Sequence, residues 1–202
     1  MMQTTPKKNS DTVPAIPEHF SPLVISESPV TKTSQRGNLT GTPRRVRDIA
    51  ADIHSSIQQW NSVHLHAVPI LKNICQIKVD EKYPDGLQDS CDVLEVDCNA
   101  LDEIVASLKL LAHQIKVAAS LHRAAENMFL TWPIDKFGDV AEKIYEAYRD
   151  EAVVKRKVLE NIAHNHQEAW KILHLAAWVH QPNITENVTR LLESLLVETG
   201  HR

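Results

Sequence analysis

The 202-residue chain is long enough for one medium domain and a tail, and its net charge of −4 gives no overall attraction to nucleic acid. It holds only five glycines and three phenylalanines, which favours helices over sheets. The three cysteines, Cys75, Cys91 and Cys98, follow no zinc-site spacing, and we expect free thiols in a reducing compartment. No run of about 18 apolar residues is present, so no membrane partner is expected.

Residues 1–41 are predicted to be a disordered tail rich in serine, threonine and proline. Their apolar side chains are too few to offset the entropy lost on ordering the chain. Thr5 and Thr42 begin the sequences TPKK and TPRR, the pattern that cyclin-dependent kinases prefer, so both are candidate phosphorylation sites. Thr42 is equally well placed to be the N-cap of the first helix, with Pro43 in its first turn.

Residues 42–202 are predicted to form a helical domain. Apolar side chains recur with a period near 3.6 residues, which places helices at about 43–79, 90–128, 133–163, 167–180 and 184–199. The first three are far longer than the average of about 11–12 residues. The pattern therefore predicts an all-α fold: an elongated, antiparallel, coiled-coil-like bundle of three long helices with two short C-terminal helices.

Polar residues mark where these helices are expected to begin and end. Thr131 is the predicted N-cap of the third helix, and either Ser90 or Asp89 can cap the second. Asn183 and Glu186 have capping-box spacing at the start of the fifth helix, and Gly200 fits its C-terminal end.

The third helix carries an oppositely charged pair, Glu151 and Lys155, inside its apolar stripe. Such a pair is costly in a plain core and more useful where register or choice of partner matters, so both residues are candidate partner-binding residues. The alternative is that the pair lies at the open edge of the stripe and that its side chains reach water.

The two short helices have small apolar sets that are expected to face the core. In the fourth helix the set is Trp170, Leu173, Ala177 and Trp178. In the fifth helix it is Leu191, Leu192, Leu195 and Leu196.

Catalytic and metal-binding motifs are missing from the sequence. It holds no glycine-rich phosphate loop, no His-Glu-x-x-His, no Gly-x-Ser-x-Gly and no paired-cysteine motif. A His-x-His pair on one helix, such as His64 and His66, cannot chelate one metal ion well. We therefore expect no catalytic residue, cofactor or metal site, and we interpret the chain as a helical interaction protein.

Four segments of the C-terminal third carry a resemblance. They are MFLTWP at 128–133, YR at 148–149 followed by VKR at 154–156, WVHQP at 178–182, and LESLLVETGHR at 192–202. Together they closely resemble the CINP family, the cyclin-dependent-kinase-interacting proteins. The similarity is weaker over residues 44–60, and the tail is longer than usual, so the chain resembles a divergent member.

The resemblance implies a nuclear adaptor without catalytic activity, present also in the cytoplasm if it acts on pre-60S particles. Its implied partners are the subunits of an AAA+ ATPase assembly, which acts on replisomes and late pre-60S ribosomal particles, and a second small helical protein in that assembly. The family is also linked to cyclin-dependent and replication-initiating kinases and to the checkpoint kinase complex that responds to DNA damage.

Three other functions remain open at this point. The chain could be a kinase-binding regulator of replication initiation that acts through its phosphorylatable tail. Direct DNA binding through Arg44, Arg45 and Arg47 would make affinity salt-sensitive, although three arginines are thin support and no nucleic-acid partner is expected. An enzyme would need a turnover for which the sequence offers no site.

A corner between the second, third and fourth helices is one predicted partner-binding surface. Its residues are Trp132, Trp178, His180, Gln181 and Pro182. The alternative for both tryptophans is an ordinary place in the core, because large aromatic side chains dominate cores and interfaces alike.

The C-terminal end is the other predicted surface. Glu198, His201 and Arg202 are polar and are expected to be exposed, which is hard to explain by a core role. A docking role for these residues competes with simple fraying of the terminus.

Overall fold

Five helices make up the part of the chain that the computed structural model describes, residues 39–121 and 128–202. They are α1 (Gly41–Ile77), α2 (Leu87–Ser120), α3 (Ile134–Ile162), α4 (Glu168–His180) and α5 (Glu186–Glu198). No strand occurs in these described ranges, so the predicted all-α fold is confirmed. The predicted tail at 1–38, with Thr5, lies outside the described residues.

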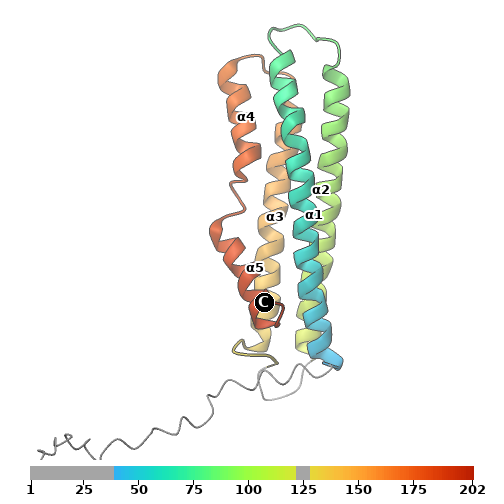
Figure 1. Ribbon diagram of the computed structural model, residues 1–202, viewed down its shortest axis with the longest axis vertical. Helices are drawn as coiled ribbons and strands as arrows, with labels where there is room; N and C mark the ends of the chain where they lie inside the picture. The colour runs from blue at the N-terminus through green and yellow to red at the C-terminus, as the bar shows by residue number, and fades with distance from the viewer. Residues whose placement is uncertain (1–38, 122–127) are drawn as a thin grey trace, which may run out of the picture. The chain divides into compact units, whose positions relative to one another are not determined.

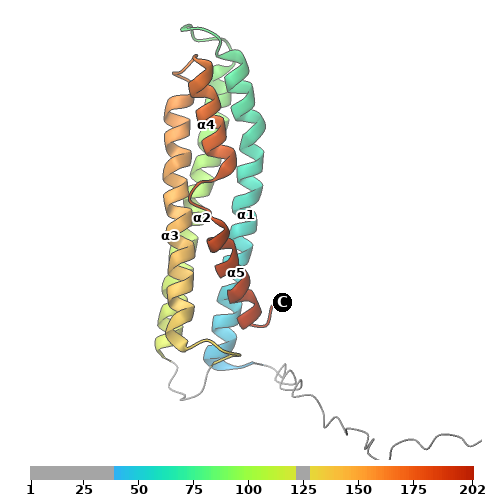
Figure 2. The ribbon, with the colours of Figure 1, turned by 90° about the vertical axis from the view of Figure 1, so that its left-hand side faces the viewer.

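The three long helices run up, down and up beside one another (Figure 1). With 37 residues, α1 is about 55 Å long at about 1.5 Å per residue. α2 packs against both α1 and α3, whereas α1 and α3 barely meet. The gap between them is filled by α4 and α5, which follow each other in the same direction (Figure 2). The unit is thus a four-helix arrangement whose fourth position holds two short helices in line.

The core lies along the axis that these four positions share. Each long helix turns its apolar stripe inward, as the 3.6-residue period predicts, because burying that stripe supplies most of the stability of a helix in a protein. Large side chains from every position are fully buried: Trp60, Leu71, Leu101, Phe137 and Trp178. In α5, Leu195 and Leu196 are buried and Leu191 and Leu192 are half-buried, so its predicted core set is confirmed.

The first two helices begin earlier than the sequence predicts. Thr40 has extended backbone angles (φ −124°, ψ 159°) and is the N-cap of α1, so Thr42 lies inside the first turn. α2 starts directly after Gly86, whose φ of 80° reverses the chain without the steric cost that a side chain would add, so residues 89–90 are helical and do not cap. α2 ends at Ser120; its predicted extension to about residue 128 falls mostly on residues 122–127, outside the described ranges.

Two residues predicted to be helix caps, Thr131 and Asn183, form tertiary hydrogen bonds instead. Thr131 does not cap α3, because Pro133 does, and Asn183 does not cap α5, because Thr185 does. Thr131 and Asn183 each donate hydrogen bonds from their backbone N–H and side chain to a carboxylate of another helix. A buried carboxylate needs such donors more than a solvated helix end does, because removing it from water without them is costly.

The C-terminal end of α5 is a closed turn. Gly200, with φ 74°, follows the C-cap, and the N–H groups of Gly200 and His201 donate to the carbonyls of Val197 (3.0 Å) and Leu196 (2.8 Å). These are the two hydrogen bonds of a Schellman motif, and the predicted role of Gly200 is confirmed. The turn also contacts α1: the Arg47 guanidinium donates to the Gly200 carbonyl (3.3 Å), and His201 Nε2 donates to the Arg47 carbonyl (2.8 Å).

Glu198 holds α5 against the start of α3. Its carboxylate accepts hydrogen bonds from the backbone N–H groups of Thr131 and Trp132 (2.7 Å for Trp132) and from the Thr131 hydroxyl (3.0 Å). The side chain is buried, so the expectation that Glu198 lies exposed is wrong. The prediction failed because three donors lie beside it that are distant in the sequence.

We predict that Glu198→Ala lowers the free energy of unfolding by about 2–4 kcal/mol, because it leaves the N–H groups of Thr131 and of buried Trp132 without their acceptor. Urea titration of the purified chain measures the change. Glu193→Ala is the matched control: Glu193 lies on the same helix, is exposed and pairs only with exposed Arg202, so its loss should cost less than about 0.5 kcal/mol. Equal losses for both variants would contradict the role of Glu198.

Candidate partner-binding surface

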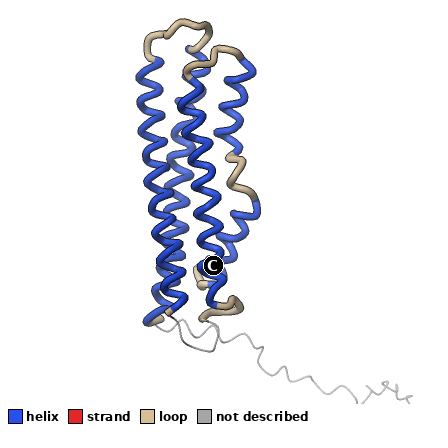
Figure 3. Tube along the Cα trace, turned by 180° about the vertical axis from the view of Figure 1, so that it is seen from behind, coloured by secondary structure: helices blue, strands red, loops and turns tan. Residues whose placement is uncertain are grey.

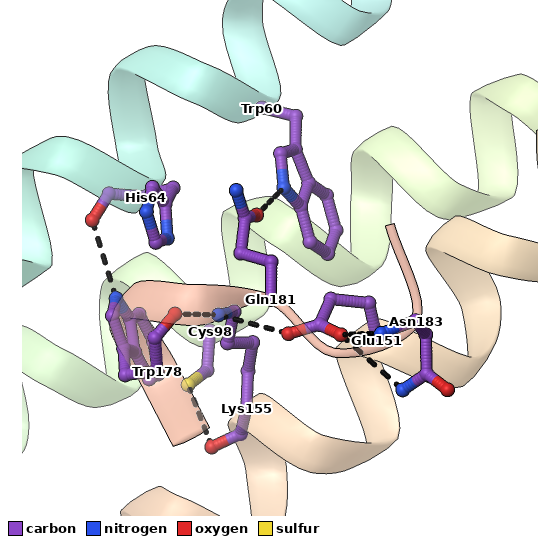
Figure 4. A network of polar contacts seen from close by, with 8 residues as sticks. All are labelled: Trp60, His64, Cys98, Glu151, Lys155, Trp178, Gln181 and Asn183. Carbon is purple, nitrogen blue, oxygen red and sulfur yellow. Dashed lines mark hydrogen bonds and ion pairs between the residues drawn. The ribbon is translucent and has the colours of Figure 1, made fainter. Parts of the chain in front are cut away.

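The break between α4 and α5 leaves a buried carbonyl without its helical donor. In a continuous helix the carbonyl of Trp178 would accept from the N–H of residue 182, but that residue is Pro182, which has none. Gln181 takes left-handed angles (φ 46°) and turns the chain out of α4. The ammonium group of Lys155, on α3, donates to the Trp178 carbonyl in place of the missing N–H (Figure 4).

Glu151 satisfies the other side of the same break. One carboxylate oxygen accepts from the Asn183 backbone N–H (3.0 Å) and side-chain amide (3.2 Å), and the other lies 3.0 Å from Lys155 Nζ. Lys155 therefore faces the C-terminal end of α4, and Glu151 faces the chain just ahead of α5. These are the helix ends whose dipoles favour a cation and an anion, respectively. We call Glu151, Lys155, Trp178, Gln181 and Asn183 the clasp.

α1 closes the clasp from the opposite side. Trp60 Nε1 donates to the side-chain oxygen of Gln181 (2.8 Å), and Trp178 Nε1 donates to the His64 carbonyl (3.2 Å). The ring of His64 stacks on Trp178, with centroids 6.3 Å apart and planes 9° apart, and Lys155 Nζ lies 4.7 Å from the Trp178 ring centroid. Trp178 is therefore held through its carbonyl, its indole N–H and the contacts of its ring with His64 and Lys155.

The clasp charges are completely enclosed. The side chains of Glu151 and Lys155 are 0% and 1% exposed, so the alternative in which the pair reaches water is wrong. The reason is that the α4–α5 break covers this part of α3. Burial lowers the pKa of Lys155, and the adjacent Glu151 carboxylate opposes that shift. The pair therefore serves the internal break, and a partner on the outer surface does not reach it.

α4 exposes apolar side chains that the sequence assigns to the core. Of its thirteen residues only Lys171 and Trp178 are buried. We define the α4 outer face as the four large apolar side chains Trp170, Ile172, Leu173 and Val179, which are 48%, 59%, 52% and 42% exposed. A helix that is apolar almost all round can turn only one side toward α1 and α3, so the expected core places of Trp170 and Leu173 are wrong.

The predicted aromatic corner is divided between two places. Trp178 lies in the clasp, half-buried Gln181 binds Trp60, and His180 and Pro182 are exposed beside them. Trp132 lies ahead of α3 instead, with its ring 5.3 Å from that of Phe137 and Lys136 Nζ 4.4 Å from its centroid. Both tryptophans are buried, as the core alternative for them states.

Three predicted contact residues remain: His201 and Arg202 follow α5, and Thr42 lies at the start of α1. His201 and Arg202 are exposed, and Arg202 lies 3.5 Å from Glu193. Thr42 is half-buried in the first turn of α1. Its hydroxyl is still at the helix end where the dipole favours a phosphate.

Metal-binding or nucleophilic clusters are not formed in the described ranges. No group of three or more His, Cys, Asp or Glu side chains among those residues could hold a metal ion. Burial raises the pKa of Cys98 to about 12 and also raises the pKa values of Cys75 and Cys91, so these thiols stay protonated. Among the same residues, no helix is long and apolar enough to cross a membrane.

Comparison with known proteins extends the similarity beyond the C-terminal third. No family model matches the chain. The chain is 28% identical to the cyclin-dependent kinase 2-interacting protein of Homo sapiens, over 85% of its own length and 96% of that protein. It is 27% identical to the Xenopus laevis protein of the same name, over 88% and 98% of the two chains. The chain is thus similar, over most of its length, to proteins named for interaction with cyclin-dependent kinase 2. Its match to the Bos taurus protein, at 28% identity, covers a similar share.

The segments that carry the family resemblance meet in two separate pairs, one at the start of α3 and one at the break between α4 and α5. Residues 128–133 and 192–202 are joined by the hydrogen bonds of Glu198 to Thr131 and Trp132. Residues 178–182 form the break between α4 and α5, visible as the loop between these two helices in Figure 3. In this chain the WVHQP segment forms a helix break, and buried Lys155 supplies the hydrogen-bond donor that the break lacks.

Sequence reasoning missed Asn183 as a member of the clasp, and it missed Trp60 and His64, which contact the clasp from α1. One signal for the clasp was nevertheless present: a proline four residues after a tryptophan leaves that tryptophan's carbonyl without a donor, and a lysine in an apolar stripe can supply one. The α4 outer face could have been found from the apolar composition of residues 168–180, which leaves no polar side for water.

We predict that the clasp charges are strongly coupled. Lys155→Met should cost about 3–5 kcal/mol, because it leaves the Glu151 carboxylate buried without its cation. Adding Glu151→Gln should recover more than about 1 kcal/mol relative to the sum of the single variants, because no unpaired charge remains. Urea unfolding of the four proteins in this cycle measures the coupling; costs that add within about 0.5 kcal/mol would contradict it.

We predict an acid-sensitive stability that depends on His64. Burial, and next the charge of Lys155, lower the pKa of His64 from 6.5 to about 4. Between these two values the unfolded chain takes up a proton that the folded chain refuses, so stability falls as pH falls through this window and is unaffected by His64 above about 6.5. From pH 7.5 to 5.5 the loss from His64 should be about 1 kcal/mol.

The measurement is the free energy of unfolding of the natural chain and of His64→Phe at both pH values. Phenylalanine keeps a flat ring against Trp178 and cannot titrate. The variant should lose less stability on acidification than the natural chain; identical losses would show that His64 does not carry the effect.

Proposed function

We propose that this chain is a non-catalytic helical adaptor that binds a protein partner through the α4 outer face. The observation that carries the proposal is the exposure of Trp170, Ile172, Leu173 and Val179 on one short helix. Single exposed apolar side chains are common in soluble proteins, but a cluster of large ones marks an interaction surface. Tryptophan is also the residue most enriched at the energetic centres of interfaces.

The structure behind this face supports an adaptor role. Trp178 anchors the C-terminal half of α4 through the clasp, and Lys171 anchors its N-terminal half by donating to the Cys75 carbonyl of α1 (3.1 Å). Lys171 also pairs with Glu168 at 2.8 Å. A helix held at both ends presents its outer side chains at little entropic cost, which favours binding.

We propose a cyclin-dependent kinase as one partner, because the relatives of this chain are named for interaction with cyclin-dependent kinase 2. The TPKK and TPRR sequences that begin at Thr5 and Thr42 support the same class of kinase. The alternative function, a regulator of replication initiation that acts through phosphorylation of the tail, rests on these sequences rather than on α4.

The finer proposal concerns the setting in which the adaptor works. We propose that the chain is a nuclear subunit of an AAA+ ATPase assembly together with a second small helical protein, acting in replisome proteostasis and fork progression and, in the cytoplasm as well, on late pre-60S ribosomal particles. Links to replication-initiating kinases and to the DNA-damage checkpoint complex belong to the same proposal. What supports it is the family resemblance of residues 128–202 and the unpartnered side of α4.

We predict that Trp170→Gln combined with Leu173→Gln reduces capture of the ATPase subunits and the kinase from nuclear extract at least about tenfold, the effect of losing one hot-spot side chain. The readout is quantitative mass spectrometry of material purified with the tagged full-length chain. Leu110→Gln combined with Val117→Gln, two exposed apolar residues of α2, is the matched control. Thermal melts should show that both double variants remain folded.

Deleting residues 1–38 together with Thr42→Ala, which removes both candidate phosphorylation sites, separates the two functions. On the adaptor proposal the deleted chain keeps the α4-dependent partners, whereas on the tail-based alternative it loses the kinase and its function. Retention of every partner by the α4 variant, or equal loss in the α2 control, would refute the α4 surface.

A further inference from the structure

The groove between α1 and α2 lies away from α4 and α5, neither of which packs against α2. It contains a hollow of about 610 Å³ between residues 55–63 of α1 and 100–107 of α2. A second hollow of about 350 Å³ lies between residues 69–73 and 89–93 of the same two helices. His66 Nδ1 and Asp97, 2.9 Å apart, join the walls between the hollows.

Small side chains repeat along both walls of the larger hollow. Ser55 and Ser62 on α1 are seven residues apart, and so are Ala100 and Ser107 on α2. Residues seven apart share a helix face, and small side chains there let another helix approach toward the lower end of the roughly 8–10 Å range of packed helix axes. From residue 55 to residue 73 the groove runs for about 27 Å, the length of a helix of about 18 residues.

The α2 wall of the groove is apolar and acidic. Val93 and Val96 are exposed. Asp89, Val93, Val96 and Ala100 are three or four residues apart in turn, so they share one face of α2. Asp89 lines the smaller hollow and Glu103 the larger one, and no lysine or arginine is among the described residues that line either. A ligand in this groove therefore meets small, apolar and amide side chains, and the only formal charge among the described lining residues is negative.

We propose that the α1/α2 groove binds an amphipathic, cationic helix of a partner protein. The apolar side of that helix lies over Ser62, Ala100 and the exposed valines, and its lysine or arginine residues face Glu103 and Asp89. Helix-in-groove recognition uses anchors at i, i+3, i+4 and i+7, which match the repeat of the groove walls. The site goes beyond the adaptor proposal, because it lies on helices α1 and α2 and uses no residue of the α4 outer face.

The experiment places a photo-crosslinking amino acid, benzoylphenylalanine, at Ser62 of the full-length chain, and at Gln59 in a second variant. Both positions are exposed, as is Glu146 on α3, which carries the same probe as a control. After irradiation in nuclear extract, mass spectrometry identifies the crosslinked peptides. The groove positions should capture one segment of another protein with net positive charge and apolar residues at i, i+3 or i+4 and i+7, and Glu146 should not.

Charge reversal completes the test. Glu103→Lys combined with Asp89→Lys should reduce the crosslink yield at Ser62 at least tenfold, whereas Asp139→Lys combined with Glu146→Lys, the same change in charge on α3, should leave it within twofold. Melting curves establish that both variants are folded. Crosslinks only to residues 1–38, to a second copy of this chain or to an acidic segment would overturn the proposal, and so would an absence of crosslinks or an unchanged yield after charge reversal.

The Trp170→Gln and Leu173→Gln variant separates this inference from the proposed function. Crosslinking at Ser62 should persist in that variant, because the groove does not include α4. Loss of α4-dependent partners with an intact groove crosslink supports two independent surfaces, whereas loss of the groove crosslink in the α4 variant overturns the independence of the groove.

Discussion

The hydrogen bond from Lys155 to the Trp178 carbonyl allows the bundle to contain a broken helix. Pro182 removes the donor that this carbonyl would use, and the position is buried, so water cannot replace it. Lys155 supplies the donor, and Glu151 balances its charge while accepting from Asn183. Two side chains one helical turn apart on α3 thereby satisfy both ends of a break in another element, which explains why charges occupy an otherwise apolar stripe.

A break in the fourth position changes what the bundle exposes. A continuous fourth helix would follow one stripe along α1 and α3, but α4 and α5 can each be oriented separately. α4 uses this freedom to bury Trp178 and Lys171 and to leave Trp170 and Leu173 in solvent. The same arrangement leaves the α1/α2 groove uncovered, because both short helices lie between α1 and α3. We interpret the exposure of the α4 outer face and of the α1/α2 groove as two consequences of the same packing of α4 and α5 between α1 and α3.

The clasp also bears on stability and specificity. A buried ion pair seldom stabilises a fold more than well-packed apolar residues would, because both charges lose their hydration. Its value here is that only one alignment of α4 and α5 places a carbonyl at Lys155 and an N–H at Glu151. A shift of the fourth position by one residue would remove the Trp178 carbonyl from Lys155 and the Asn183 N–H from Glu151, so we interpret the pair as a device that sets the register of α4 and α5 against α3.

The sequence by itself determined the helices, their approximate lengths and their apolar stripes, because the 3.6-residue period and the helix-ending glycine and prolines act through neighbours along the chain. It also placed Glu151 and Lys155 together in a stripe. Only the tertiary structure decided that this pair is buried, that Thr131 and Asn183 serve distant carboxylates rather than helix ends, and that Trp170 faces solvent while Trp178 is enclosed. These outcomes depend on which groups meet across the bundle, and hydrogen bonding and burial there outweigh local preferences by several-fold in free energy.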